Sequence, residues 1–106
     1  MAEVVWTEPA LSDLDAIADY IALRNQTAAL NLVRAVFKHV EQLTHHPKSG
    51  SHPPELKGKR YRQIIEPPCR VFYRQDKKSI YVLYVMRAER RLRPNRLTAR
   101  AKKSRG

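Results

Sequence analysis

Apolar residues recur at helical spacing in the first half of the chain and predict two amphipathic helices. The two stripes consist of Leu11, Leu14, Ile17, Ala18 and Ile21, and then of Ala29, Leu32, Val33, Val36, Phe37, Val40 and Leu43. Thr7 suits the N-cap of the first helix, and Asn25 or Thr27 that of the second, because these side chains accept hydrogen bonds from backbone N–H groups. The short link between the stripes predicts an antiparallel helix hairpin.

Short runs of β-branched and aromatic residues predict four strands around this hairpin. They cover residues 3–7, before the helices, and residues 61–66, 69–74 and 79–86, after them. The connections between the last three strands are short, so these strands are expected to form an antiparallel meander. The last of them is apolar on both faces, which is typical of a central strand.

This order of elements predicts an α+β domain over residues 1–95, with the helix hairpin packed on one face of a small sheet. The opposite face is expected to be exposed. It should carry arginines, because Arg70, Phe72 and Arg74 alternate onto one side of their strand.

The hydrophobic content falls sharply after Met86, where Leu92 and Leu97 are the large apolar residues that remain. A short helix from about Glu89 is therefore expected. Residues 96–106 are predicted to form a flexible basic tail.

Charge is distributed unevenly along the chain. Its 106 residues include 21 Lys and Arg against 10 Asp and Glu, a formal net charge of +11. Residues 1–24 hold five acids against one arginine, whereas residues 57–74 hold six cations, and residues 87–106 nine, against one glutamate each. The basic second half favours an anionic partner.

Several classes of protein are excluded or disfavoured by the composition. The longest uncharged apolar run covers residues 80–86, far short of the about 20 residues of a membrane span, so no membrane partner is expected. Early acidic residues argue against a secretory leader, and a cytoplasmic location is expected. The single cysteine, Cys69, reads as a small buried hydrophobe. His45, His46 and His52 have no Cys or carboxylate cage beside them, so no metal site or cofactor is predicted.

A set of residues spread over positions 3–94 resembles the RelE/ParE superfamily of toxins from type II toxin–antitoxin (plasmid stabilisation) systems. The resemblance depends on the order and spacing of Trp6, Thr7, Ala10, Asp13, Leu14, Ile17, Tyr20, Ile21, Pro47, Gly50, Leu56, Gly58, Arg60, Tyr61, Arg62, residues 70–74, Ile80, Val82, Leu83, Val85, Arg87 and Arg90. It implies the fold described above, a growth-arresting toxin, and a cognate antitoxin that binds it in a hetero-oligomer. The antitoxin is expected to be acidic.

The resemblance leaves two targets open. RelE-like members cleave messenger RNA on the ribosome, whereas ParE-like members inhibit DNA gyrase. RNA cleavage needs a base, an acid and cations, and arginine supplies only the cation. The cationic residues of a nuclease would here be Lys57, Lys59, Arg62, Arg70 and Arg87. No Tyr or His follows Tyr84, so the acid/base residue is missing and gyrase inhibition is favoured.

Two sets of contact residues follow from the predicted faces. The target-facing residues are expected to be Arg62, Arg70, Arg74, Arg87 and Arg90. The antitoxin-binding residues are expected to be Arg60, Arg62, Arg74, Leu14 and Ile21.

Simpler explanations exist for the same features. The strand arginines would equally suit a solvated sheet face, and the strand tyrosines a core rather than a base-stacking surface. The charge alone also suggests a plain nucleic-acid-binding module. Against that reading, much of the excess charge lies in the predicted tail, and no helix suited to a DNA groove is apparent.

Overall fold

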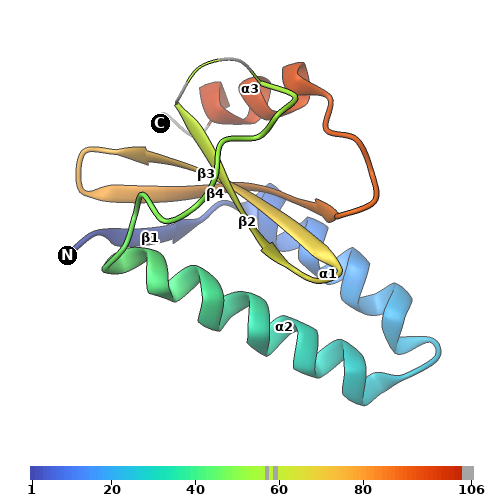
Figure 1. The fold of residues 1–106 in the computed structure, drawn as a ribbon. Helices are drawn as coiled ribbons and strands as arrows, with labels where there is room; N and C mark the ends of the chain where they lie inside the picture. Colours follow the sequence, from blue (N-terminus) through green and yellow to red (C-terminus); the bar gives the residue numbers. More distant parts are fainter. Residues whose placement is uncertain (57, 59, 104–106) are drawn as a thin grey trace.

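The computed structural model describes residues 1–56, 58 and 60–103. Its elements are β1 (Glu3–Trp6), α1 (Glu8–Ala22), α2 (Gln26–Glu41), the short 3₁₀ helix η1 (Gln42–Thr44), β2 (Tyr61–Glu66), β3 (Cys69–Asp76), β4 (Ser79–Arg87) and α3 (Pro94–Lys103). They form a four-stranded sheet with the α1–α2 hairpin on one side and α3 on the other (Figure 1). The predicted α+β class is confirmed.

The two long helices begin where the sequence predicts. The Thr7 hydroxyl accepts from the Ala10 N–H at 3.4 Å and donates to the Val82 carbonyl at 2.7 Å, so it caps α1 and ties the helix to the sheet. Of the two candidate caps for α2, Asn25 takes the role, because its side-chain oxygen accepts from the Ala28 N–H at 3.0 Å. The apolar stripes of both helices then face the sheet.

The sheet has the order β1-β4-β3-β2. Strands β2, β3 and β4 form the predicted antiparallel meander, and β4 is the predicted central strand. β1 adds to the other edge of β4 in parallel, pairing Glu3 with Ser79 and Trp6 with Val82. The α1–α2 helix hairpin, which links β1 to β2 in the chain, therefore carries the chain across one face of the sheet from one edge to the other.

Two hydrophobic clusters lie on opposite faces of the sheet. The larger one packs α1 and α2 onto the sheet and contains the buried Cys69, as expected for a small hydrophobe. The smaller one is formed by Phe72, Leu83, Met86, Leu92, Leu97 and Ala101. The face that the sequence predicted to be exposed is thus covered by residues 92–101.

Residues 96–103, for which the sequence favoured a flexible tail, are instead helical. The helix begins at Pro94 rather than near Glu89. Leu97 and Ala101 lie one turn apart on α3, and both are buried against the sheet. Two apolar residues at that spacing are enough to anchor one helix face, although the segment looks too basic to fold on composition alone.

A β-bulge in β4 shapes the second face. The pairing of β3 with β4 shifts between Phe72 and Tyr73, which leaves Leu83 as the extra residue. Leu83 and Tyr84 both join the α3-side cluster, whereas Val82 and Val85 join the other. Among the described residues, no helix is long and apolar enough to cross a membrane.

Candidate functional site

The structure divides the predicted site arginines between the two faces of the sheet. Arg62 pairs in register with Tyr73, whose side chain belongs to the hairpin-side core. Arg70 and Arg74 lie on the opposite, α3-covered face. These residues therefore do not converge on one surface as the sequence suggested.

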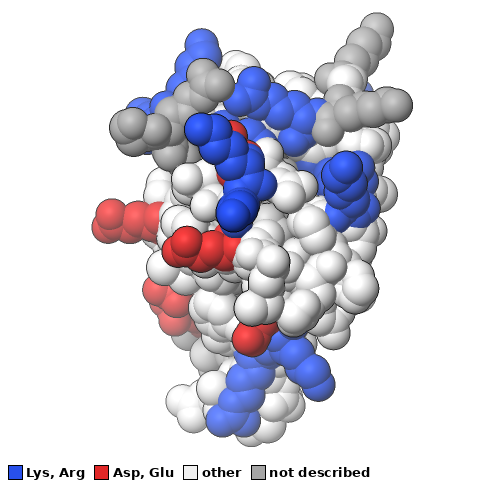
Figure 2. All heavy atoms as spheres, turned by 90° about the vertical axis from the view of Figure 1, so that its left-hand side faces the viewer, with Lys and Arg blue, Asp and Glu red and all other residues white. Residues whose placement is uncertain are grey.

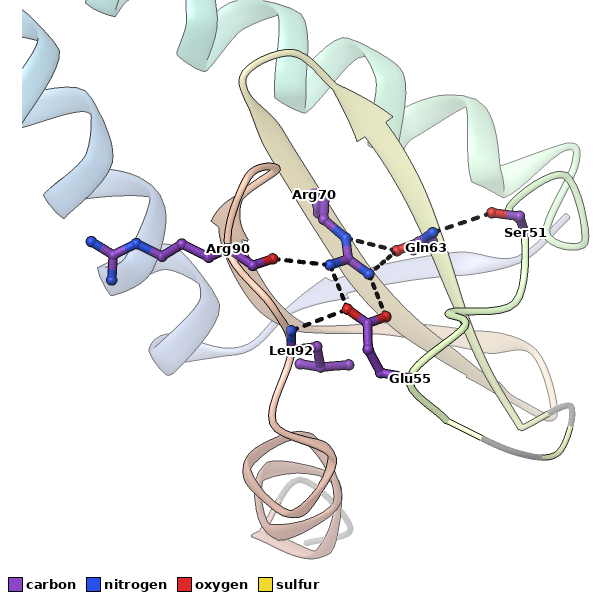
Figure 3. A network of polar contacts seen from close by, with 6 residues as sticks. All are labelled: Ser51, Glu55, Gln63, Arg70, Arg90 and Leu92. Atoms are coloured by element: carbon purple, nitrogen blue, oxygen red, sulfur yellow. Dashed lines mark hydrogen bonds and ion pairs between the residues drawn. The ribbon is translucent and has the colours of Figure 1, made fainter.

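Arg70 is the centre of a buried network that joins three segments of the chain (Figure 3). Its guanidinium forms a bidentate ion pair with Glu55, with both N···O distances at 2.8 Å, and donates to the Gln63 side chain and the Arg90 carbonyl. Glu55 also accepts from the Leu92 N–H at 3.1 Å. The loop before β2, strand β3 and the segment after β4 are thereby held together.

The Arg70 guanidinium stabilises the ionised form of the Glu55 carboxyl. The hydrogen bond from Arg70, aided by the one from Leu92, lowers the pKa of Glu55 from 4.5 to about 2 despite its burial. The side chains are only 9% (Arg70) and 12% (Glu55) exposed. Arg70 is thus occupied within the fold and is not free to contact a target or a scissile phosphate.

Arg74 is also buried, at 2% exposure, and cannot be the target- or antitoxin-facing residue that the sequence suggested. Its Nη1 donates to the Ala101 carbonyl at 3.3 Å, and its guanidinium lies 5.5 Å from the centroid of the Tyr81 ring. Nε and Nη2 have no hydrogen-bond partner among the described residues. The alternation of the strand predicted its face correctly, but α3 covers that face.

The remaining predicted contact residues are scattered. Arg62 donates to the carbonyls of Lys48 and Gly50, at 3.0 and 2.7 Å, so it ties down the loop before β2. Arg60 is exposed and Ile21 is half-buried, whereas Leu14 is buried in the core and cannot contact an antitoxin in this fold. Lys57 and Lys59 lie outside the described residues.

Five other arginines gather around an open groove of about 640 Å³ between α1 and the segment that follows β4. We call it the arginine groove, and its cationic side is formed by Arg87, Arg90, Arg91, Arg93 and Arg96. Ile17 and Tyr20 of α1 contribute apolar surface to its lining. The guanidinium of Arg87 lies over the Tyr20 ring, 5.5 Å from its centroid.

Sequence reasoning assigned only Arg87 and Arg90 of this groove. It assigns no contact to Arg91 or Arg93, because the sequence predicts only a short helix from about Glu89 in this segment. Arg96 was placed in the tail. The available signal was the density of arginine itself, five in the ten residues 87–96 beside the last strand.

A second ion pair lies beside the arginine groove and includes Asp13 from its lining. Asp13 of α1 and Arg100 of α3 form a bidentate pair across the edge of β4, beyond the end of β1. Asp13 also accepts from the Val85 N–H at 3.0 Å, and Arg100 donates to the Leu83 carbonyl at 3.1 Å. The two side chains thus satisfy strand-edge groups that β1 leaves unpaired and fasten α3 to α1.

Two titratable side chains whose pKa values are raised, those of Tyr73 and Cys69, are buried in the core on the hairpin side and do not line this groove. The side chain of Tyr73 is buried on the hairpin side, and desolvation raises its pKa. Burial also raises the pKa of the Cys69 thiol to about 11, which keeps it protonated at neutral pH. Within residues 1–56, 58 and 60–103, no three His, Cys, Asp or Glu side chains could hold a metal ion together.

The face of the molecule at the β3–β4 turn is not uniformly cationic. Figure 2 views the molecule from the side of the β3–β4 turn and shows basic and acidic side chains on one face. The basic ones gather mainly toward the end where α3 lies. A face of mixed sign is a poor track for a nucleic-acid backbone.

Comparisons with known proteins agree with this architecture. The family described as "ParE toxin of type II toxin-antitoxin system, parDE" matches residues 4–92. A solved structure titled "Chromosomal ParDE TA system from P. aeruginosa" is similar, with a TM-score of 0.70 and 30% sequence identity over 84% of this chain and 98% of that chain. No curated protein matches the sequence. The chain belongs to the ParE toxin family of type II toxin–antitoxin systems.

Proposed function

We propose that this chain is a cytoplasmic toxin that arrests growth by inhibiting DNA gyrase and is neutralised by a cognate antitoxin. The observation that carries the proposal is its membership of the ParE family over residues 4–92. The similarity to a ParDE toxin–antitoxin structure supports an antitoxin as its partner. Gyrase is the target that the ParE-like branch of the superfamily implies.

The geometry of the cationic residues supports an inhibitor rather than a nuclease. Cleavage by a 2′-hydroxyl needs an acid, a base and phosphate-binding cations around one phosphate. Arg70 is held by Glu55, and Arg62 by the Lys48 and Gly50 carbonyls. Arg87 lies beside Tyr20, at the other end of the hairpin-side face from Arg62. An inhibitor needs only a surface that binds its target, and the arginine groove is such a surface.

A gyrase supercoiling assay tests the target. We expect the purified chain to suppress supercoiling of a relaxed plasmid in a dose-dependent way, and the cognate antitoxin to restore it. Arg90→Ala combined with Arg93→Ala should weaken inhibition, because both side chains are exposed in the arginine groove. Lys77→Ala combined with Lys78→Ala removes the same charge at the β3–β4 turn and is the matched control.

Two outcomes would contradict this proposal. If supercoiling is unaffected at every dose while the chain cleaves messenger RNA on ribosomes, the gyrase proposal fails and the chain is a RelE-like nuclease. If the turn variant and the groove variant lose inhibition equally, the arginine groove is not the surface that inhibits gyrase.

A further inference from the structure

The two edges of the sheet differ in how they are protected. The outer edge of β2 is covered at Gln63, whose N–H and carbonyl both bond to the backbone of Ser51, at 2.7 and 3.0 Å. No segment among the described residues bonds in this way to the outer edge of β1 over residues 4–6. Proteins usually protect an edge strand with a proline, a lysine or a bulge, and β1 has none of these. The edge of β1 is therefore open to a further strand.

The parallel ladder determines which backbone groups of β1 are free. Glu3 and Thr7 donate their N–H groups toward β4, at 2.7 and 3.2 Å. Because successive residues of a strand point in opposite directions, Val4 and Trp6 direct their N–H and carbonyl groups away from β4. The Ala2 N–H points the same way, and η1 already accepts its hydrogen bond at 3.0 Å. The free stretch thus begins at Val4 and ends at Trp6.

These free groups are spaced so that β1 fits a second copy of itself. In an antiparallel pair, opposed residues at alternate positions exchange two hydrogen bonds. A two-fold axis beside Val5 sets Val4 of one copy against Trp6 of the other, and the reverse. Both free N–H groups of each copy then meet a free carbonyl, as an isologous contact requires.

Apolar side chains flank this edge on both faces of the sheet. Val4 and Trp6 are half-buried on the hairpin side, where the Trp6 ring contacts Phe37. Val5 is half-buried on the other side, where it lines a hollow of about 260 Å³ together with Tyr81 of β4. Pairing of two first strands would remove apolar surface from water on both faces.

Opposite charges lie at the two ends of the free edge. The exposed Glu3 side chain shares the α3-side face with Val5, because strand side chains alternate. The exposed Lys103 of α3 lines the same hollow as Thr7, at the far end of the strand. Neither charge is in an ion pair with a described residue. The two-fold arrangement places Glu3 of each copy opposite Thr7 of the other, and so beside its Lys103.

We propose that β1 is a self-association surface, through which two copies of this chain pair their first strands antiparallel and join their sheets into one. A second copy is the occupant because the backbone groups and the end charges are both complementary under the two-fold axis. The contact is short, and interfaces below about 1,200 Å² are usually weak, so a Kd of about 10–100 µM is expected. The proposal is independent of the gyrase target.

Sedimentation equilibrium of the full chain, from about 5 to 500 µM, measures the association. The weight-average mass should rise from the 12.3 kDa of the monomer toward twice that value. Val4→Pro removes an N–H that points away from β4, a position where an edge strand tolerates proline, and should raise the Kd by about tenfold or more. Val4→Ala is the matched control. It truncates the side chain but keeps the N–H, so the Kd should stay within about threefold of the wild-type value.

A charge exchange tests the same arrangement without altering the backbone. Glu3→Lys and Lys103→Glu each replace two attractions in the dimer with two repulsions, and each should raise the Kd about fivefold. The chain that carries both substitutions has opposite charges again, so its Kd should return to within about twofold of the wild-type value. This exchange remains informative if circular dichroism shows that Val4→Pro does not fold.

Three results would overturn the proposal. The first is a monomeric mass at every concentration. The second is association that Val4→Pro and the single charge variants leave unchanged, because the contact would then lie elsewhere. The third concerns hydrogen exchange at the Val4 and Trp6 amides, which should slow as the concentration of the chain rises. Protection of these amides only after addition of the cognate antitoxin would assign the edge to that protein instead.

Discussion

Replacing Glu55 by glutamine removes the negative charge from the centre of the buried network and leaves the shape of the side chain nearly unchanged. Glutamine can still accept from the Leu92 N–H, but Arg70 is left as a buried cation without its anion. A buried pair that loses one partner is destabilised by about 3–5 kcal/mol. We therefore expect Glu55→Gln to destabilise the fold strongly at neutral pH.

The pKa of Glu55 gives a second figure for how much its charge contributes to the free energy of unfolding. A fall from 4.5 in the unfolded chain to about 2 in the fold corresponds to about 3 kcal/mol of stability at neutral pH. This contribution is fully present well above pH 4.5 and is lost as the pH falls through 2, below which the carboxyl is protonated in both states. The stability gap between the wild type and the Glu55→Gln variant should therefore narrow through that window.

Urea unfolding followed by the fluorescence of Trp6, the single tryptophan, measures this gap. The Trp6 ring lies 4.8 Å from that of Phe37, at the contact between β1 and α2, and therefore reports on the larger core. Glu89→Gln is the control, because it removes a charge from an ion pair whose carboxylate side chain is 60% exposed. That variant should lose less than about 1 kcal/mol. Equal losses in the two variants, or a gap independent of pH, would refute the reasoning.

Three other substitutions test separate features. Arg74→Met should raise the free energy of unfolding measured in urea by about 1 kcal/mol, because it removes a buried cation with two nitrogens that have no partner among the described residues; a lower free energy of unfolding would show that the guanidinium contacts outweigh this cost. Gly50→Ala should cost about 2 kcal/mol or more in the same measurement, because a Cβ there would lie 2.6 Å from the Tyr73 hydroxyl oxygen. Asp13→Asn keeps an acceptor for the strand edge but removes the ion pair with Arg100, so amide hydrogen exchange in α3 should accelerate more than in α2. Uniform acceleration would show that the pair does not specifically hold α3.

Much of the fold could be predicted because it is encoded locally. The hairpin is marked by its 3.6-residue periodicity and by Thr7 and Asn25 at the caps, and the meander by short turns between alternating strands. The parallel partner of β1 has no such local signal. It depends on which strand edge remains free once β4 has formed its antiparallel ladder with β3.

The candidate site was harder to predict for a related reason. Alternation placed Arg70 and Arg74 on one face correctly, but it carries no information on what covers that face. Arg70 is held by Glu55, 15 residues earlier in the sequence, and Arg74 contacts Ala101 of α3, 27 residues later. Leu97 and Ala101 alone mark α3 as a packed helix, and the many cations around them hide that pattern.

The pairing of β1 with β4 also bears on when the protein acquires its structure during synthesis. The hydrogen bond from Thr7 to Val82 spans 75 residues, and the Asp13–Arg100 pair spans 87. The first strand therefore waits without a partner until the ribosome has translated most of the chain, and such non-local contacts form late and slowly. A truncated translation product that ends before β4 has no arginine groove. A messenger broken in its first three quarters thus yields only fragments without the proposed toxic surface.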